Sequence, residues 1–258
     1  VKSHPDSQLM QYVTKTDGLS TMVMYSMDSF YNSETGECKF DSEDFISLLE
    51  LCNTFPKEYD YDSGESESTA SLLRSGKVLL TSVNMSSFSD IQMYPALYGE
   101  PVNFIGFPTN SGSGSVVGFN NRFCVAAKSK NKEGAWAFIR SFLLPDNQNK
   151  LDWNLPVNKA VFEQKIADAM KEQDDNDVVT NSTWWYDDVE ITIGPLTEED
   201  AQAVRDMVYN ATTEAAYDQQ LMNIITEEAE YYFNGEKSAQ EIAGIIQSRA
   251  QLYIDENR

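Results

Sequence analysis

The stretch that decides the fold class is residues 232–249, which read YFNGEKSAQEIAGIIQSR. Asn234 and Gly235 predict the end of one helix, because glycine readily adopts the left-handed conformation that closes a helix. Ser238 and Glu241 have the spacing of a capping box, so a second helix is expected to begin directly afterwards. The apolar face of this second helix is made by Ile242, Ile245 and Ile246. The pattern predicts two consecutive amphipathic helices at the end of the chain.

Similar signals place further helices along the chain. A stretch rich in Met, Tyr and Phe predicts a buried helix over residues 19–31, and Asp41 begins the next helix. Asn131 and Thr197 are expected to cap two later helices, and another helix is expected after Asn158. Strands are predicted for Val78–Val83, Val102–Phe107 and Phe119–Ala127. Helices, a few strands and then more helices indicate an α/β or α+β protein with helix in the majority.

Composition excludes several classes of function. The chain has 258 residues, enough for one large domain or two lobes, with 19 Lys and Arg against 41 Asp and Glu, which gives a net charge of −22. Nucleic-acid binding needs a basic face, and adsorption to an anionic membrane needs basic residues, so neither partner is expected. The sequence contains no apolar run of about 18 residues that would predict a membrane span. The opening at Val1 is typical of a mature or trimmed product.

Cysteine and histidine are too few for most catalytic or metal sites. Cys38, Cys52 and Cys124 are widely spaced, without a C-x-x-C pair. We expect Cys52 and Cys124 to be small buried apolar residues, while a Cys38–Cys52 disulfide stays open. The single histidine, His4, argues against histidine-dependent triads and against metal sites with several histidines.

The glycine-rich loop of residues 108–115 does not predict a nucleotide site. Gly112, Gly114 and Gly118 have the spacing G-x-G-x-x-x-G, which is one residue too long for a dinucleotide fingerprint. The loop also leads into a predicted strand instead of a helix. No cofactor and no metal are therefore expected.

Four motifs, in this order, resemble the extracellular solute-binding proteins of bacterial sugar ABC transporters (family 1, maltodextrin-binding-like). They lie at residues 36–56, at 104–136, at 155–159 and at 232–249, and the resemblance covers most of the chain from about residue 19. It implies a periplasmic-binding-protein-like fold of type II, in which two α/β lobes hold a ligand in the cleft between them.

The resemblance also implies a domain organisation. Residues 1–117 and 163–258 resemble two parts of the C-terminal lobe of the family, and residues 118–162 resemble the segment that crosses back into the N-terminal lobe. Most of the family's N-terminal lobe has no counterpart in this sequence. The chain therefore resembles a C-terminal fragment of a family member.

The function implied by the resemblance is non-enzymatic. The chain would bind a carbohydrate and deliver it to the permease subunits of an ABC importer. It would lie outside the cell, or in the periplasm of a double-membrane bacterium. Contact with the membrane would come only through a lipid anchor upstream of Val1.

A carbohydrate site needs aromatic side chains for the apolar faces of the sugar and short polar side chains for its hydroxyl groups. The candidate aromatic contacts are Trp184, Trp185, Tyr186, Phe88 and Phe119. The candidate hydrogen-bonding residues are Asn84, Asn120, Asn121, Arg122 and Asp187. Maltodextrin-binding relatives place a stacking tryptophan after the strand that corresponds to Val78–Val83; this chain lacks it, and Phe88 is the candidate substitute.

Several of these residues have an alternative role that the sequence leaves open. One or two of the Trp184–Tyr186 side chains can pack inward, since three adjacent aromatic residues cannot all face one core. Asn84 and Phe88 also suit an ordinary loop at a strand end, and Asn120 and Asn121 suit hinge backbone. Tyr231, Tyr232 and Tyr253 are expected to serve the core or the lobe surface, and Trp136 and Trp153 are expected to pack.

Two alternative functions also stay open. A glycoside hydrolase would need two carboxylates at a defined separation, and the chain has many carboxylates but no recognisable catalytic motif. A non-transport interaction module of a larger cell-surface protein is the third possibility.

Overall fold

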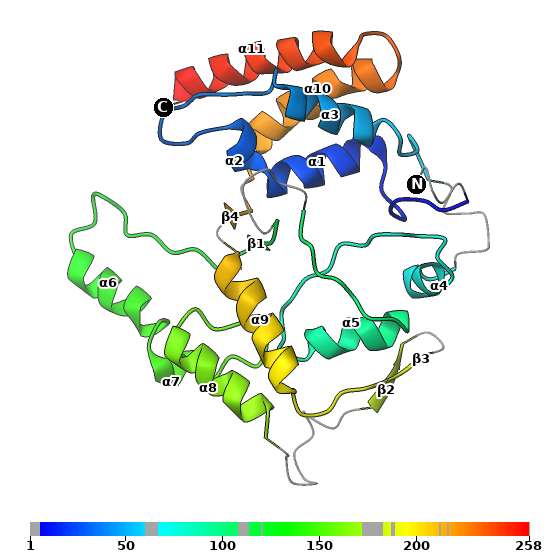
Figure 1. Cartoon of the computed structure of the whole chain (residues 1–258). Helices are drawn as coiled ribbons and strands as arrows, with labels where there is room; N and C mark the ends of the chain where they lie inside the picture. The colour runs from blue at the N-terminus through cyan, green and yellow to red at the C-terminus, as the bar shows by residue number, and fades with distance from the viewer. Residues whose placement is uncertain are drawn as a thin grey trace. The chain divides into compact units, whose positions relative to one another are not determined.

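The computed structural model describes residues 6–59, 67–107, 114–119, 121–171, 183–186, 189–211, 213–215 and 217–257. The chain forms two compact units, each built from three segments. Unit 1 comprises Val1–Leu9, Glu67–Phe104 and Phe119–Tyr209, and unit 2 comprises Met10–Ser66, Ile105–Gly118 and Asn210–Arg258. Figure 1 shows that helices dominate both units.

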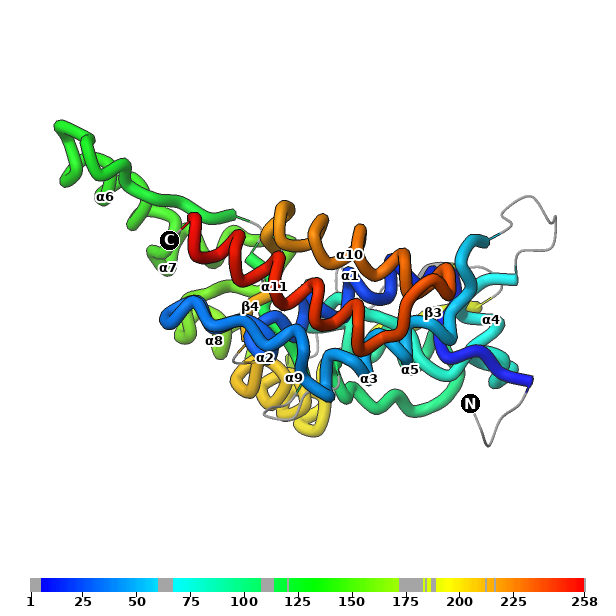
Figure 2. The backbone as a smooth tube through the Cα atoms, turned by 90° about the horizontal axis from the view of Figure 1, so that it is seen from above, coloured from blue at the N-terminus to red at the C-terminus, as the bar shows by residue number. Residues whose placement is uncertain are grey.

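Unit 2 is a layered arrangement of helices with one short parallel strand pair. Its elements are α1 (Lys15–Tyr25), α2 (Met27–Phe30), α3 (Glu43–Cys52), β1 (Val116–Val117), β4 (Thr213–Glu214), α10 (Gln219–Phe233) and α11 (Ala239–Asn257). The two C-terminal helices, α10 and α11, lie side by side (Figure 2). α1 packs against α10, and α3 packs against both α1 and α11.

Local capping signals account for the helix boundaries of unit 2. At the start of α11, Ser238 Oγ accepts a hydrogen bond from the Glu241 amide while Glu241 Oε2 accepts one from the Ser238 amide, so the predicted capping box is confirmed. Asn234 is the C-cap of α10, as expected, and Gly235 follows in the left-handed region at φ 77°. The helix predicted from Asp41 begins at Glu43, because Ser42 Oγ caps the amide of Phe45.

Three phenylalanine rings form the centre of unit 2. Phe45 lies edge-on to Phe30 and to Phe40, with ring centroids 5.3 and 5.2 Å away. None of the three is more than 5% exposed. Edge-to-face packing of this kind stabilises a core beyond simple area burial, so this cluster joins α2, α3 and the segment between them.

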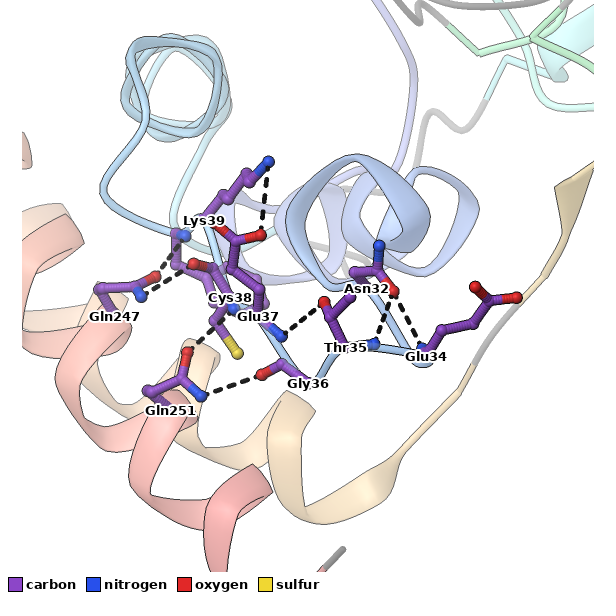
Figure 3. A network of polar contacts seen from close by, with 10 residues as sticks. Asn32, Glu34, Thr35, Gly36, Glu37, Cys38, Lys39, Gln247 and Gln251 are labelled. Atoms are coloured by element: carbon purple, nitrogen blue, oxygen red, sulfur yellow. Dashed lines mark hydrogen bonds and ion pairs between the residues drawn. The ribbon is translucent and has the colours of Figure 1, made fainter.

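The segment between α2 and α3 is held by two glutamines of α11 (Figure 3). Gln247 Oε1 accepts from the amide of Phe40 at 2.7 Å, and Gln247 Nε2 donates to the carbonyl of Cys38 at 2.9 Å. One turn later, Gln251 Oε1 accepts from the amide of Cys38 and Gln251 Nε2 donates to the carbonyl of Gly36. The two side-chain amides therefore satisfy backbone groups that a neighbouring strand would otherwise pair with.

Unit 1 surrounds two smaller apolar clusters. Its elements are α4 (Thr69–Arg74), α5 (Asp90–Tyr98), α6 (Lys132–Ser141), α7 (Pro145–Gln148), α8 (Lys159–Ala169), β2 (Thr183–Tyr186), β3 (Val189–Thr192) and α9 (Glu198–Asn210). Phe162 and Ile166 of α8 pack with Val204 of α9 in one cluster. Leu97 of α5 and Ile191 of β3 lie in the other. These clusters fix α5 and the β2–β3 hairpin relative to one another.

The expected helix starts of unit 1 are also confirmed. Asn131 caps α6 through the amide of Gly134, and Asn158 caps α8 through the amides of Ala160 and Val161. At the start of α9, Thr197 Oγ accepts from the amide of Asp200 and Asp200 Oδ2 accepts from the amide of Thr197. Side-chain caps are local signals, so the sequence alone locates them.

The three predicted strands are wrong. Val78 makes a single isolated bridge with Gln8, and no described residue of 79–83, 102–107 or 119–127 belongs to a strand. A strand exists only where a neighbour accepts its backbone hydrogen bonds, and apolar, β-branched composition does not specify that neighbour. The sequence identified extended segments correctly as apolar and non-helical, but it could not show whether they pair.

Several residues that the sequence predicts to be buried are exposed in the structure. Cys124 is exposed, while Cys52 is buried as expected. Trp136 and Trp153, expected to pack, are 52% and 76% exposed. Apolar sequence does not by itself supply a covering surface, and the described part of the chain offers none for these side chains. Cys38 and Cys52 are both buried free thiols, so they are not bridged.

No helix in the described ranges combines the length and the apolar character needed to cross a membrane.

Candidate functional site

The aromatic triplet at residues 184–186 belongs to a strand, β2. β2 pairs antiparallel with β3, and the register places Trp185 opposite Glu190 and Tyr186 opposite Val189. Aromatic and β-branched residues stabilise such a two-stranded hairpin through cross-strand contacts. In a strand, successive side chains point alternately to the two faces of the sheet, so neighbouring residues of β2 lie on opposite faces.

The two faces of the hairpin differ in character. Ile191, on the same face as Tyr186 and Val189, is 1% exposed and belongs to the apolar cluster with Leu97. The opposite face carries Trp185, which is 66% exposed, together with exposed polar side chains: Glu190, Thr183 and Thr192. Trp185 and Tyr186 therefore cannot stack on the same sugar ring. The side chain of Trp184 and the whole of Asp187 lie outside the described residues.

Helix α5 brings two tyrosines to the side of the hairpin that carries Tyr186. Tyr94 and Tyr98 are four residues apart, and their half-buried rings stack with centroids 6.0 Å apart at an interplanar angle of 23°. Tyr98 also packs against the cluster that contains Ile191. We call Tyr94, Tyr98 and Tyr186 the tyrosine surface; Tyr186 itself is 53% exposed.

The hydroxyl groups of the tyrosine surface influence one another. Burial raises the pKa of Tyr98 above its ordinary value of 10.0, and the hydroxyls of Tyr94 and Tyr186 add to that rise, while a hydrogen bond with Thr81 opposes it. Burial also raises the pKa of Tyr94, with a contribution from the charge of Asp90. The hydroxyls of Tyr94 and Tyr98 are thus neutral at physiological pH and can donate or accept hydrogen bonds.

The loop of residues 84–89 joins this surface through its first residue. Tyr94 Oη donates to the carbonyl of Asn84 at 3.1 Å. The loop is held in place by the buried carboxylate of Asp90, whose Oδ2 accepts from the amides of Ser86 and Ser87 at 2.7 and 2.8 Å. Asn84 is exposed at one end of this fixed loop, beside the tyrosine surface.

Phe88, at the other end of the loop, has a packing partner in unit 1. Its ring lies 5.5 Å from that of Phe162, centroid to centroid, and it contacts the cluster containing Val204. The ring is half-buried, so this contact is the alternative role that the sequence left open. Its part in ligand binding stays a prediction.

The remaining candidates lie in the stretch before α6. Phe119 is 46% exposed, and Asn121 and Arg122 are exposed as well. Asn120 lies outside the described residues. The structure therefore joins Asn84 and Tyr186 through α5, and a role in ligand binding for Phe119, Asn121 and Arg122 stays a prediction.

The sequence reasoning missed Tyr94 and Tyr98. Their signal was the spacing in Asp90–Tyr98, DIQMYPALY, since residues four apart share one face of a helix. A pair of tyrosines on one face, beside an exposed asparagine, offers apolar ring area and hydrogen-bonding groups together. This chemistry suits a neutral, hydroxyl-rich small molecule.

Three carboxylates of unit 1 accept hydrogen bonds that lower their pKa values. Hydrogen bonds from Tyr209 and Arg205 hold the pKa of Glu163 below its ordinary value, and those from Lys171 and Gln164 do the same for Asp168. Burial acts to raise the pKa of Asp200, but hydrogen bonds from Gln92 and Thr197 outweigh it and lower the value. Within the described ranges, no group of three or more His, Cys, Asp or Glu side chains is positioned to hold a metal ion.

Comparison with known proteins gives one family match. The family model described as bacterial extracellular solute-binding protein matches residues 14–176. A search of curated proteins finds no match. The matched range includes α5, the loop of residues 84–89 and the stretch before α6, and it ends before the β2–β3 hairpin.

Proposed function

Because the chain belongs to the family of bacterial extracellular solute-binding proteins, we propose that it binds a carbohydrate and delivers it unaltered to an ABC importer. Membership implies a periplasmic-binding-protein-like fold, a small-molecule ligand, ABC permease partners and an extracellular or periplasmic location. Beyond what membership implies, the proposal has three specific parts. They are a carbohydrate as the ligand, a lipid anchor upstream of Val1, and the assignment of residues 118–162 to a second lobe.

The observation that carries the carbohydrate proposal is the tyrosine surface. Its rings supply apolar plates, and its three hydroxyls with the Asn84 amide supply donors and acceptors that suit sugar hydroxyl groups. The surface lies on α5 and β2, which the apolar cluster of Leu97 and Ile191 holds together. Rigid elements that support both kinds of group favour specific binding over loose adsorption.

The pKa directions do not favour the glycoside hydrolase. A general acid in a glycosidase needs a carboxyl group whose pKa is raised, so that it is protonated at working pH. In unit 1 the pKa values of Glu163, Asp168 and Asp200 are all lowered. These groups stay ionised and accept structural hydrogen bonds instead.

Thermal unfolding and calorimetric titration against a panel of mono- and oligosaccharides test the proposal, with amino acids and short peptides as the comparison panel. A sugar at 100 times its dissociation constant should stabilise the protein by about 2.7 kcal/mol, and the sugar should be recovered unchanged. Stabilisation only by a different class of solute would contradict the carbohydrate proposal, but it would leave the proposal of solute binding intact. Turnover of a glycoside, lost on changing one Asp or Glu, would contradict the non-enzymatic function.

A further inference from the structure

Asp90, the first residue of α5, is a buried carboxylate. Its side chain is 7% exposed, and no other charged side chain of the described ranges is buried to that degree. Taking a carboxylate out of water is costly unless hydrogen bonds replace its hydration. The contacts of Asp90 must therefore account for its burial.

The carboxylate of Asp90 binds the loop in front of its helix. Asp90 Oδ2 accepts from the amides of Ser86 and Ser87 at 2.7 and 2.8 Å, which is the length of a charge-assisted hydrogen bond. A polar side chain at a helix start more commonly caps the amides of the first turn. The two amides that Asp90 binds precede α5, so these bonds fix the loop of residues 84–89.

Two further contacts hold the main chain around Asn84. Tyr94 lies four residues after Asp90 on the same face of α5, and its hydroxyl donates to the carbonyl of Asn84 at 3.1 Å. The half-buried side chain of Met85 packs against the apolar cluster of α8 and α9. The chain is therefore held at Asn84, at the next residue and at the amide of Ser86.

The result is an exposed polar side chain on a fixed main chain. Asn84 is exposed, and its side-chain amide can both donate and accept hydrogen bonds. A binding group whose main chain is already ordered loses less conformational freedom when a solute binds, and this raises affinity. Sites depend in this way on supporting residues that do not touch the solute.

We propose that Asp90 is a positioning residue of the solute site, which sets affinity by holding Asn84 in its binding geometry before the solute arrives. This inference rests on the proposed function, because Asn84 is taken as a residue that contacts the solute. Asp90 itself does not touch the solute, since its carboxylate is buried against the loop amides.

Hydrogen exchange of the solute-free protein tests whether Asp90 holds the loop. Asp90→Ala removes the acceptor, so the amides of Ser86 and Ser87 should exchange at least about tenfold faster than in wild type. Asp90→Asn keeps an acceptor of the same shape without the charge, and it should give an intermediate rate. Circular dichroism checks that each variant is folded, and Asp90→Asn alone decides if Asp90→Ala is not. Unchanged exchange at both amides would overturn the inference.

A double-mutant cycle with Asn84 tests whether Asp90 acts through that residue. The probe is whichever of the neutral trisaccharides maltotriose, cellotriose and xylotriose binds the full chain most tightly in calorimetry, or the amino acid or peptide of the comparison panel if only that binds. Asp90→Ala should weaken binding by about fivefold or more in wild type, but by less than about twofold in Asn84→Ala. A merely structural loss would persist after the Asn84 side chain is removed.

Asp200→Ala is the matched control. Asp200 also places a carboxylate at the start of a helix, where its Oδ2 accepts from the amide of Thr197, but this contact does not involve the loop of residues 84–89. The variant should lose stability and still bind the probe within about twofold of wild type. Exchange at the amides of Ser86 and Ser87 should stay as in wild type.

The outcomes separate this inference from the proposed function. Additive losses in the cycle, or equal losses of affinity in Asp90→Ala and Asp200→Ala, would overturn the positioning role and leave solute binding standing. An Asn84→Ala variant that binds the probe as tightly as wild type would do the same. Absence of binding by every solute tested would overturn both.

Discussion

The hydroxyl of Tyr94 on α5 donates a hydrogen bond to the main-chain carbonyl of Asn84, 3.1 Å away. This bond links the helix that carries Tyr94 and Tyr98 to the loop that carries a sequence-predicted ligand residue. The loop is independently fixed by Asp90. The arrangement separates two roles for Tyr94, since its ring stacks on Tyr98 and its hydroxyl orients Asn84.

Tyr94→Phe keeps the stacked ring and removes the hydroxyl. The Asn84 residue is exposed, so water can replace the lost donor and unfolding free energy should fall by less than about 1 kcal/mol. Carbohydrate affinity, measured by calorimetry, should fall about two- to tenfold, the worth of one hydrogen bond. Tyr209→Phe is the matched control, because its hydroxyl binds Glu163 on another face. An equal loss of affinity in both variants would count against the tyrosine surface.

Tyr186→Ala and Trp185→Ala test which face of the hairpin holds the ligand. Tyr186→Ala should lower carbohydrate affinity by about 1–3 kcal/mol, as expected for an aromatic contact at the centre of a site. Trp185→Ala should have the smaller effect, because Trp185 faces away from Tyr94 and Tyr98. Titration of both variants with the same sugar gives the comparison, and the reverse order would move the site to the Trp185 face.

Gln247→Glu removes one donor from the contacts between α11 and residues 36–40. A carboxylate can still accept from the amide of Phe40, but it cannot donate to the carbonyl of Cys38. One unsatisfied, part-buried carbonyl should lower the free energy of unfolding by about 1–3 kcal/mol in a urea titration. Gln240→Glu, at an exposed position of α11, adds the same charge and should change stability by less than about 0.5 kcal/mol. Similar losses in both variants would mean that added charge, not the lost donor, is responsible.

Glu163→Gln tests the pH dependence that hydrogen bonding to this carboxylate produces. Tyr209 and Arg205 lower the pKa of Glu163 in the folded protein below its ordinary value of 4.5. A lowered folded pKa means that the ionised group adds stability above the unfolded pKa, and that this stability disappears as pH falls through the folded pKa. Wild type should therefore exceed Glu163→Gln in stability at pH 7, with the difference shrinking below about pH 4.5.

Urea titrations at several pH values measure this difference. Glu199→Gln, at an exposed position of α9, changes the net charge equally and is the control. A difference between wild type and Glu163→Gln that stays constant down to pH 3 would contradict the expected linkage.

Thiol labelling tests the state of the three cysteines. Burial raises the pKa of Cys52 to about 12, and burial with the nearby charge of Asp255 raises that of Cys38 to about 11. Cys124 is exposed. Since the thiolate is the reactive form, native protein at pH 8 should label rapidly at one thiol and denatured protein at three. Cys124→Ser should remove the rapid reaction, and a denatured count of one would instead indicate a Cys38–Cys52 bridge.

Helices were predictable because their signals are local. Ser238 with Glu241, Asn131 and Thr197 all cap the helices that the sequence placed after them. A cap needs only residues within one turn, so it survives changes in distant packing. The same reasoning located the start of α8 after Asn158 and the end of α10 at Asn234, since neighbouring residues also set these boundaries.

Strand pairing and burial were not predictable, because both depend on partners far along the chain. Residues 78–83 have an apolar sequence but form only one bridge, at Val78. Residues 184–186 pair with a neighbouring strand that their own sequence does not predict. Trp136 and Trp153 show the same limit for burial, which no local pattern determines. For the candidate site, the sequence proposed Asn84 and Tyr186, but only the fold shows that Tyr94 contacts Asn84 and stacks with Tyr98.

The glutamine contacts of α11 have a consequence for biosynthesis. Gln247 and Gln251 hold residues that were translated 209 and 215 positions earlier. The carbonyls of Gly36 and Cys38 therefore lack these two donors until residues 247–251 have emerged from the ribosome. Contacts this distant along the chain form slowly, so unit 2 should reach its final form only after α11 has emerged, and premature termination shortly before Gln247 should expose it to proteases.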